Sequence, residues 1–118
     1  MTKILIAEDN DLNLKLMTDI LLIQNYEVEA VCDGDAALKK LMECEYDLLL
    51  LDLQMPKVSG FEVLEELNKC KHKVKTVVVS ACAMAPEIDR AKELGCLDFI
   101  TKPIRLNNFL STIKKVLE

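Results

Sequence analysis

Short, continuous apolar runs recur along this chain and limit the folds that it can adopt. Residues 4–7, 48–51 and 77–79 contain no polar side chain. Such runs are typical of strands that helices cover on both faces of a parallel sheet, and they are far too short to span a membrane. Segments with the spacing of amphipathic helices lie between them, so strand-like and helix-like segments alternate five times. This alternation predicts an α/β fold.

The predicted elements form a single doubly wound (βα)5 sandwich of three layers. We expect strands at residues 3–7, 27–31, 47–52, 75–80 and 96–101, and helices at 11–24, 34–43, 61–71, 86–94 and 105–117. The second strand alternates polar and apolar residues, and the fifth carries Asp98 in its middle, as half-exposed edge strands do. With right-handed crossovers, this favours a parallel five-stranded sheet of order 2-1-3-4-5.

Length and composition restrict the function classes. A chain of 118 residues without a Pro/Gly-rich linker predicts one domain, residues 1–118, with no output domain. The net charge of −5 argues against direct binding to nucleic acid or to anionic membranes. Five widely spaced cysteines, with no Cys-x-x-Cys pair and no signal peptide, predict reduced thiols in a cytoplasmic protein.

The first predicted helix carries more apolar residues than one face needs. We expect a broad face toward the sheet, formed by Leu12, Leu16, Met17, Ile20 and Leu21. Leu14 lies at the margin of that face, and Leu14, Thr18 and Leu22 form a line along the helix. This line is either a docking stripe for a partner helix or a set of ordinary exposed side chains, and the sequence leaves both readings open.

Reactive side chains follow four of the predicted strands. Glu8 and Asp9 follow the first strand, Asp52 ends the third, Ser80 ends the fourth and Lys102 follows the fifth. The carboxyl ends of parallel strands meet at the edge of the sheet where such folds bind ligands. Three adjacent carboxylates repel one another and require a cation, and oxygen ligands favour Mg²⁺, for which Mn²⁺ could substitute.

Asp52 is the best candidate for a nucleophile, because four leucines precede it and its side chain emerges from the centre of the sheet. A carboxylate in that place can attack an activated phosphoryl group and form an acyl phosphate. We expect Asp9 to bind the metal directly, Glu8 to bind it directly or through water, and the backbone carbonyl of Gln54 to complete the metal site.

The two remaining groups suit an anionic guest. The Lys102 ammonium would hold phosphoryl oxygens, and the Ser80 hydroxyl would donate a hydrogen bond to one of them. Each residue alone could be an ordinary polar strand end. Five of them at four strand ends, with complementary charges, favour a phosphoryl-transfer site.

These motifs resemble the receiver domains of bacterial two-component response regulators, which have a CheY-like, flavodoxin-type fold. The similarity extends over essentially the whole chain. The matching motifs are Glu8-Asp9, Asp52 with Met55-Pro56 and Gly60, Ser80-Ala81, and Lys102-Pro103. The first segment, residues 4–10, is also similar to hybrid-kinase receivers and to stand-alone regulators of cell-cycle phosphorelays.

The resemblance implies that Asp52 accepts a phosphoryl group from a sensor histidine kinase or a histidine phosphotransfer protein. It implies a cis peptide between Lys102 and Pro103. It also implies that Ser80 is a switch hydroxyl that moves toward the phosphate, while the Phe99 ring turns inward.

The resemblance further places the signalling surface on the fourth helix, the fifth strand and the fifth helix. Ile88 and Ile104 are candidate contacts there for a downstream protein target, with burial of Ile88 against the sheet as the alternative. Gln54 and Cys82 occupy positions that tune dephosphorylation, and neither is an acid, which predicts a persistent phosphorylated form. The protein would be a monomer or a weak dimer that depends on phosphorylation.

Other functions remain as alternatives. The chain could act as a phosphate shuttle or a phosphate sink rather than as a switch. A phosphatase of the haloacid dehalogenase type would also use an aspartyl nucleophile, but it needs an acid where Gln54 stands. A nucleotide- or flavin-binding module would need a phosphate-binding loop, whereas residues 8–11 are acidic here. We therefore expect no enzyme beyond autophosphorylation and slow dephosphorylation.

Overall fold

One parallel sheet organises the chain. The computed structural model describes residues 2–55, 57–81 and 84–118, and within them five strands pair in the order β2-β1-β3-β4-β5. The strands are β1 (Lys3–Ala7), β2 (Glu27–Val31), β3 (Leu48–Leu51), β4 (Lys75–Ser80) and β5 (Asp98–Thr101). The helices are α1 (Asp11–Ile23), α2 (Gly34–Glu43), α3 (Gly60–Lys69), α4 (Ala85–Glu93) and α5 (Leu106–Leu117). The predicted CheY-like fold and strand order are confirmed.

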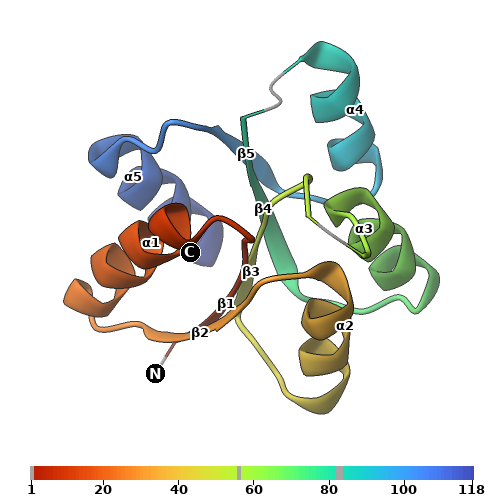
Figure 1. The fold of residues 1–118 in the computed structure, drawn as a ribbon, viewed down its shortest axis with the longest axis horizontal. Coiled ribbons are helices and arrows are strands. Elements are labelled where there is room, and N and C mark those ends of the chain that lie inside the picture. The colour runs from red at the N-terminus through yellow and green to blue at the C-terminus, as the bar shows by residue number, and fades with distance from the viewer. Residues whose placement is uncertain (1, 56, 82–83) are drawn as a thin grey trace.

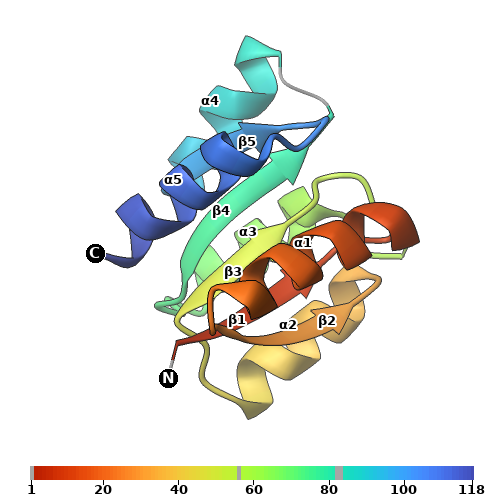
Figure 2. The same ribbon diagram turned by 90° about the vertical axis from the view of Figure 1, so that its left-hand side faces the viewer.

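The helices form the two outer layers of the sandwich. Figures 1 and 2 show α1 and α5 against one face of the sheet, and α2, α3 and α4 against the other. Successive residues of a strand point to opposite faces, so each inner strand supplies both cores. Leu49 and Leu51 of β3 pack under α2 to α4, while Leu48 and Leu50 pack under α1 and α5. This is why the middle of each inner strand is apolar on both faces.

The predicted boundaries of the strands and helices are confirmed to within two residues, and the two differences of two residues have local causes. Strand β5 begins at Asp98 rather than at residue 96, because the Cys96 amide still donates a hydrogen bond to the Ala91 carbonyl of α4. Helix α3 ends at Lys69 rather than at residue 71. Lys71 has a φ of 55°, a left-handed conformation that cannot continue a right-handed helix.

Two residues favour the observed boundaries of α4. Pro86 lies in the first turn, where its missing N–H costs no helical hydrogen bond. Gly95 follows the helix with a φ of 105°, a backbone conformation that residues other than glycine rarely adopt.

The predicted inner face of α1 is wrong for two of its five residues. Met17 and Leu21 are buried, but Leu12 is 80% exposed and Leu16 is 43% exposed. The five predicted residues span an arc of about 180° at 3.6 residues per turn, which is wider than the sheet can cover. The helix is turned toward Leu14, which packs against the core, so Leu12 and Leu16 lie outside.

The structure also bears on the cysteines and on membrane insertion. Cys32, Cys44, Cys70 and Cys96 are free thiols. In the part of the chain that is described, no helix combines the length and the apolar character needed to cross a bilayer.

Candidate functional site

The structure gathers the predicted site residues at the carboxyl edge of the sheet. Each strand ladder continues just past the strand end and thereby fixes the residue that follows. The Asp52 amide donates to the Ala7 carbonyl at 3.0 Å, and the Lys102 amide donates to the Ser80 carbonyl at 3.0 Å. The Glu8 amide is held in the same way by the last residue of β2. Side chains from β1, β3 and β5 therefore converge on one place.

An acidic cluster lies at this edge. Oxygen atoms of Glu8, Asp9 and Asp52 lie within 4.8 Å of one another. Glu8 and Asp52 are buried and Asp9 is exposed, so the cluster opens to solvent on one side. The Oε2 atom of Glu8 is buried, and no group of the described residues donates a hydrogen bond to it. Because such an oxygen needs a partner, and because the donors are carboxylates, these residues could hold a divalent cation.

The Lys102 ammonium lies between the two buried carboxylates. Its Nζ atom is 2.8 Å from Glu8 Oε1 and 3.0 Å from Asp52 Oδ2, and the side chain is only 13% exposed. Burial by itself lowers the pKa of Lys102, but the hydrogen bonds to Glu8 and Asp52 outweigh it and the pKa is raised. The ammonium therefore stays charged at neutral pH and supplies a fixed cation.

The site disfavours the charged form of the Glu8 carboxylate. Burial raises its pKa, the negative charge of Asp52 adds to the rise, and the hydrogen bond from Lys102 opposes it. Its Oε1 atom also accepts a hydrogen bond from the Asn10 amide at 3.3 Å. The Asn10 side chain caps α1 by accepting from the Asn13 amide at 3.0 Å, so the start of the helix holds this loop in place.

The loop after β3 holds the second oxygen of Asp52. The Gln54 amide donates to Asp52 Oδ1 at 3.1 Å. With Lys102 on Oδ2, each oxygen of the Asp52 carboxylate has a donor and the group is fixed in orientation. The Gln54 side chain is exposed beside it.

The predicted switch residues lie on the neighbouring strands β4 and β5. Ser80 is fully buried at the end of β4, and its Cα partner across the sheet is Thr101, the residue before Lys102. Phe99 is half-buried and packs against the core under α2 to α4. The peptide bond between Lys102 and Pro103 is cis. Pro56 and Cys82 lie outside the described residues.

The predicted docking residues differ in accessibility. Leu14 and Thr18 are half-buried, Leu22 is 52% exposed, and Ile88 and Ile104 are half-buried. Ile104 packs against the core under α1 and α5.

The sequence reasoning missed a different apolar stripe on α1, formed by Leu12, Leu16 and Ile23. The i, i+4, i+11 spacing places these three residues within an arc of about 40°, and this signal was available in the sequence.

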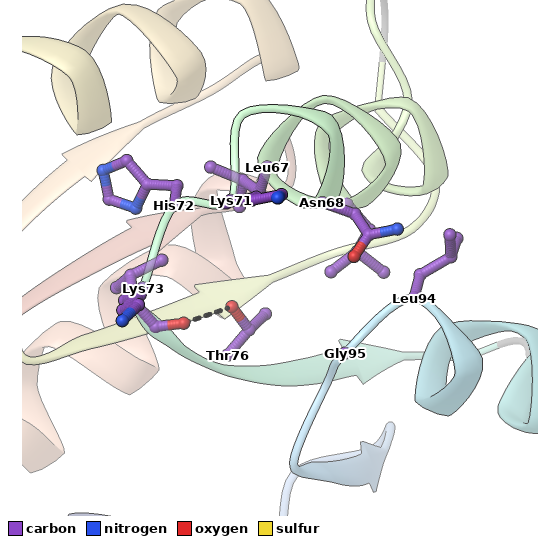
Figure 3. Close-up of a pocket in the computed structure, with 10 residues that line it drawn as sticks. Leu67, Asn68, Lys71, His72, Lys73, Thr76, Leu94 and Gly95 are labelled. Carbon is purple, nitrogen blue, oxygen red and sulfur yellow. Dashed lines mark hydrogen bonds between the residues drawn. The ribbon is translucent and has the colours of Figure 1, made fainter.

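A hollow of about 300 Å³ lies at the opposite, amino-terminal edge of the sheet. Figure 3 shows it between the end of α3 and the turn after α4, with Leu67, Asn68, Thr76 and Leu94 around it. The Thr76 hydroxyl donates to the Val74 carbonyl at 3.4 Å. No acidic residue lines this hollow among the described residues, so its chemistry is unlike that of the acidic cluster.

The five-stranded parallel sheet and the acidic cluster at its carboxyl edge are the features of a receiver domain, and the comparison with protein families gives the same class. Residues 4–114 match the response regulator receiver domain, and the chain belongs to this family. The match includes β1 through most of α5 and therefore all the residues of the acidic cluster.

The similar proteins include stand-alone regulators. The chain is 39% identical to the polar-differentiation response regulator DivK of Brucella ovis, over 99% of this chain and 98% of that protein. Among solved structures, the receiver domain of HemR from Leptospira biflexa has a TM-score of 0.92 and 30% identity, covering 100% of this chain and 95% of that one. The response regulator TrrA of Thermotoga maritima, solved with Mg²⁺-BeF, has a TM-score of 0.88 and 28% identity, covering 98% and 99%.

Proposed function

We propose that this protein is a response regulator in a two-component phosphorelay and that Asp52 is its phosphoacceptor. The observation that supports this most directly is the bridge from the Lys102 ammonium to Glu8 and Asp52, which joins three strand ends in one charged cluster. The similarity to DivK, a response regulator by name, supports the same role.

The chemistry would be a transfer of a phosphoryl group from a phosphohistidine. An Asp52 carboxylate oxygen attacks phosphorus, the phosphorus–nitrogen bond breaks, and its electron pair stays on the leaving imidazole. The hydrogen bonds from Gln54 and Lys102 fix the carboxylate, which lowers the entropic part of the barrier. The Lys102 ammonium would then contact the phosphoryl oxygens, which would lie beside its present partners Glu8 and Asp52.

Mg²⁺ is the metal that we assign to the cluster, with Mn²⁺ as a substitute. Glu8, Asp9, Asp52 and the Gln54 carbonyl would hold it, and the orphaned Oε2 of Glu8 is the structural reason to include Glu8. When bound, the ion supplies neutralisation of the charge that accumulates on the transferring oxygens. The Mg²⁺-BeF complex of TrrA is consistent with this assignment.

Phosphorylation would be communicated through Ser80 and Phe99. The new phosphoryl oxygens would attract the Ser80 hydroxyl, and the space it leaves would admit the half-buried Phe99 ring. The surface of α4, β5 and α5 would then change its contacts with a downstream protein. Leu97 and Leu106, each 54% exposed, are accessible apolar side chains on that side.

The phosphate donor would dock on the exposed stripe of α1. Leu12, Leu16 and Ile23 lie on one line of the helix, and the helix begins two residues after Asp9. A histidine-bearing helix that packs on this line would bring its imidazole to the acidic cluster. Three exposed apolar side chains in one line suit such a partner.

Intact mass spectrometry after incubation with phosphoramidate tests the phosphoacceptor. This small donor has a phosphorus–nitrogen bond like that of phosphohistidine. We expect one Mg²⁺-dependent phosphoryl adduct in the natural chain and none in Asp52→Asn. The control Asp19→Asn, at an exposed site on α1, should keep the adduct. An adduct that persists in Asp52→Asn would contradict the proposal.

The docking surface needs a comparison between donors. Leu12→Ala and Ile23→Ala should each slow transfer from a phosphorylated histidine phosphotransfer protein about tenfold, because we assign these residues to the centre of the interface, where truncation of a hot-spot side chain costs more than about 1 kcal/mol. Neither should change the rate with phosphoramidate. Met42→Ala, at a similarly exposed site on α2, is the matched control. Equal slowing with both donors would place the effect in the acidic cluster and not in docking.

A further inference from the structure

Asp52 and Gln54 lie in the loop between β3 and α3, and the two ends of this loop are joined by backbone contacts. The Gly60 amide donates to the Leu53 carbonyl at 3.1 Å. A β-carbon added at Gly60 would overlap the Asp52 carbonyl oxygen and lie 2.6 Å from Leu53 Cα. Only a glycine allows the start of α3 to approach the phosphoacceptor peptide this closely. One end of the loop is thereby fixed to the sheet.

A second backbone contact comes from α2. Gly34 is the first residue of that helix and is buried. A β-carbon added there would overlap the carbonyl oxygen of Val58 and lie 2.8 Å from its carbonyl carbon. These are main-chain atoms and cannot rotate aside as a side chain does. The start of α2 therefore limits where Val58 can lie.

The neighbouring side chains reinforce the same contact. Asp33 caps α2 by accepting from the Ala36 amide at 2.8 Å, which fixes where the helix begins. Its other oxygen lies 3.7 Å from the Lys57 ammonium, on the residue before Val58. The Lys57 side chain is 70% exposed and the ion pair is long and therefore weak, so the backbone contact of Gly34 is the stronger constraint.

Resting on the proposed function, we propose that Gly34 is a positioning residue for phosphoryl transfer to Asp52. Asp52 is held in the sheet and Gly60 is held against Leu53, so a displacement of Val58 would be passed to the short segment that joins these two points. Gln54 lies in this segment; its amide holds Asp52 Oδ1, and its carbonyl is our assigned metal ligand. Gly34 acts through this loop and touches no reacting atom.

Gly34→Ala tests this, with Gly95→Ala as the matched control. A β-carbon at Gly95 meets nothing within 4 Å, but the φ of 105° makes alanine strained there, far from the acidic cluster. Mg²⁺ affinity by calorimetry and the phosphoramidate reaction rate are measured beside the urea midpoint. We expect Gly34→Ala to weaken Mg²⁺ binding at least fivefold and to slow phosphorylation about tenfold. Gly95→Ala should lower the urea midpoint while both site readouts stay within twofold of the natural chain.

Val58→Gly provides a second variant that adds no atom. It loosens the same loop from the opposite side and should weaken Mg²⁺ binding in the same direction, so the proposal stays testable if Gly34→Ala does not fold. Unchanged Mg²⁺ affinity in Val58→Gly or in folded Gly34→Ala overturns the positioning role. The positioning role is also overturned if Gly95→Ala, at the same urea midpoint, loses as much Mg²⁺ affinity as Gly34→Ala. If the natural chain takes up no phosphoryl group, the proposed function fails, while the Mg²⁺ readout still decides the role of Gly34.

Discussion

Replacement of Lys102 by methionine should strongly destabilise the metal-free protein. The variant keeps the length of the side chain but removes the cation that lies 2.8 Å from Glu8 and 3.0 Å from Asp52. Two carboxylates are then left buried beside each other without that counter-charge. Breaking a buried ion pair by removing one partner costs about 3–5 kcal/mol. We expect about 3 kcal/mol, the lower end, because Glu8 can take up a proton.

Urea unfolding near neutral pH without divalent ions measures this cost. With a denaturant slope of about 2 kcal/mol per molar urea, the midpoint should fall by about 1.5 M. Mg²⁺ should restore more stability to Lys102→Met than to the natural chain, because the ion then supplies the missing positive charge and displaces no ammonium.

Lowering the pH should also reduce the loss of stability in Lys102→Met. The pKa of Glu8 is already raised, and loss of the Lys102 hydrogen bond, which lowers it, must raise it further. A carboxyl whose pKa is raised in the folded state favours folding in its protonated form. Its stabilising contribution is complete below the ordinary value of 4.5 and is lost as pH rises through the raised pKa. The gap between variant and natural chain should therefore narrow as pH falls toward that value.

Lys115→Met is the matched control for this experiment. Lys115 is 77% exposed and lies 3.5 Å from Asp98, so the same substitution should change stability by less than about 0.5 kcal/mol. Stability of Lys102→Met equal to that of the natural chain would refute the reasoning. A large loss that neither Mg²⁺ nor acid relieves would refute it too, since the cause would then be packing and not charge.

Three other substitutions test the fold by urea unfolding. Tyr46→Phe removes the 2.6 Å hydrogen bond that lowers the pKa of Glu29, and should cost about 1.5 kcal/mol near neutral pH. This contribution exists above the ordinary pKa of 4.5 and is lost as pH falls through the lowered value, so the difference from the natural chain should shrink in acid; a constant difference would contradict it. Ser59→Ala removes the capping box with Glu62 and should cost about 1 kcal/mol, whereas no change would show that the cap is unimportant. Phe109→Ala empties a fully buried position and should cost about 3–5 kcal/mol; less than 1 kcal/mol would mean that the core repacks.

The strand order and the acidic cluster could be predicted because both follow from local pattern. Continuous apolar runs identify inner strands, alternation identifies edge strands, and the carboxyl ends of parallel strands must meet. The strand order alone therefore places four of the site residues at one edge of the sheet: Glu8, Asp9, Asp52 and Lys102.

Features that depend on the competition between neighbouring elements could not be predicted. The rotation of α1 is set by how much of its apolar arc the sheet covers. The sequence pattern therefore places Leu12 and Leu16 on the inner face, although both are exposed. The start of β5 depends on a hydrogen bond from Cys96 to α4. The contact of Gly34 with Val58 joins the start of α2 to the loop before α3, and no sequence pattern links these two segments.

The bridge between Glu8 and Lys102 also has a consequence during protein synthesis. The two residues are 94 positions apart in sequence, and Lys102 follows β5, which leaves the ribosome after the other four strands of the described sheet. A nascent chain displays the Asp52 carboxylate long before it contains the ammonium that holds it. The two buried carboxylates therefore gain this counter-charge only when β5 has joined the sheet.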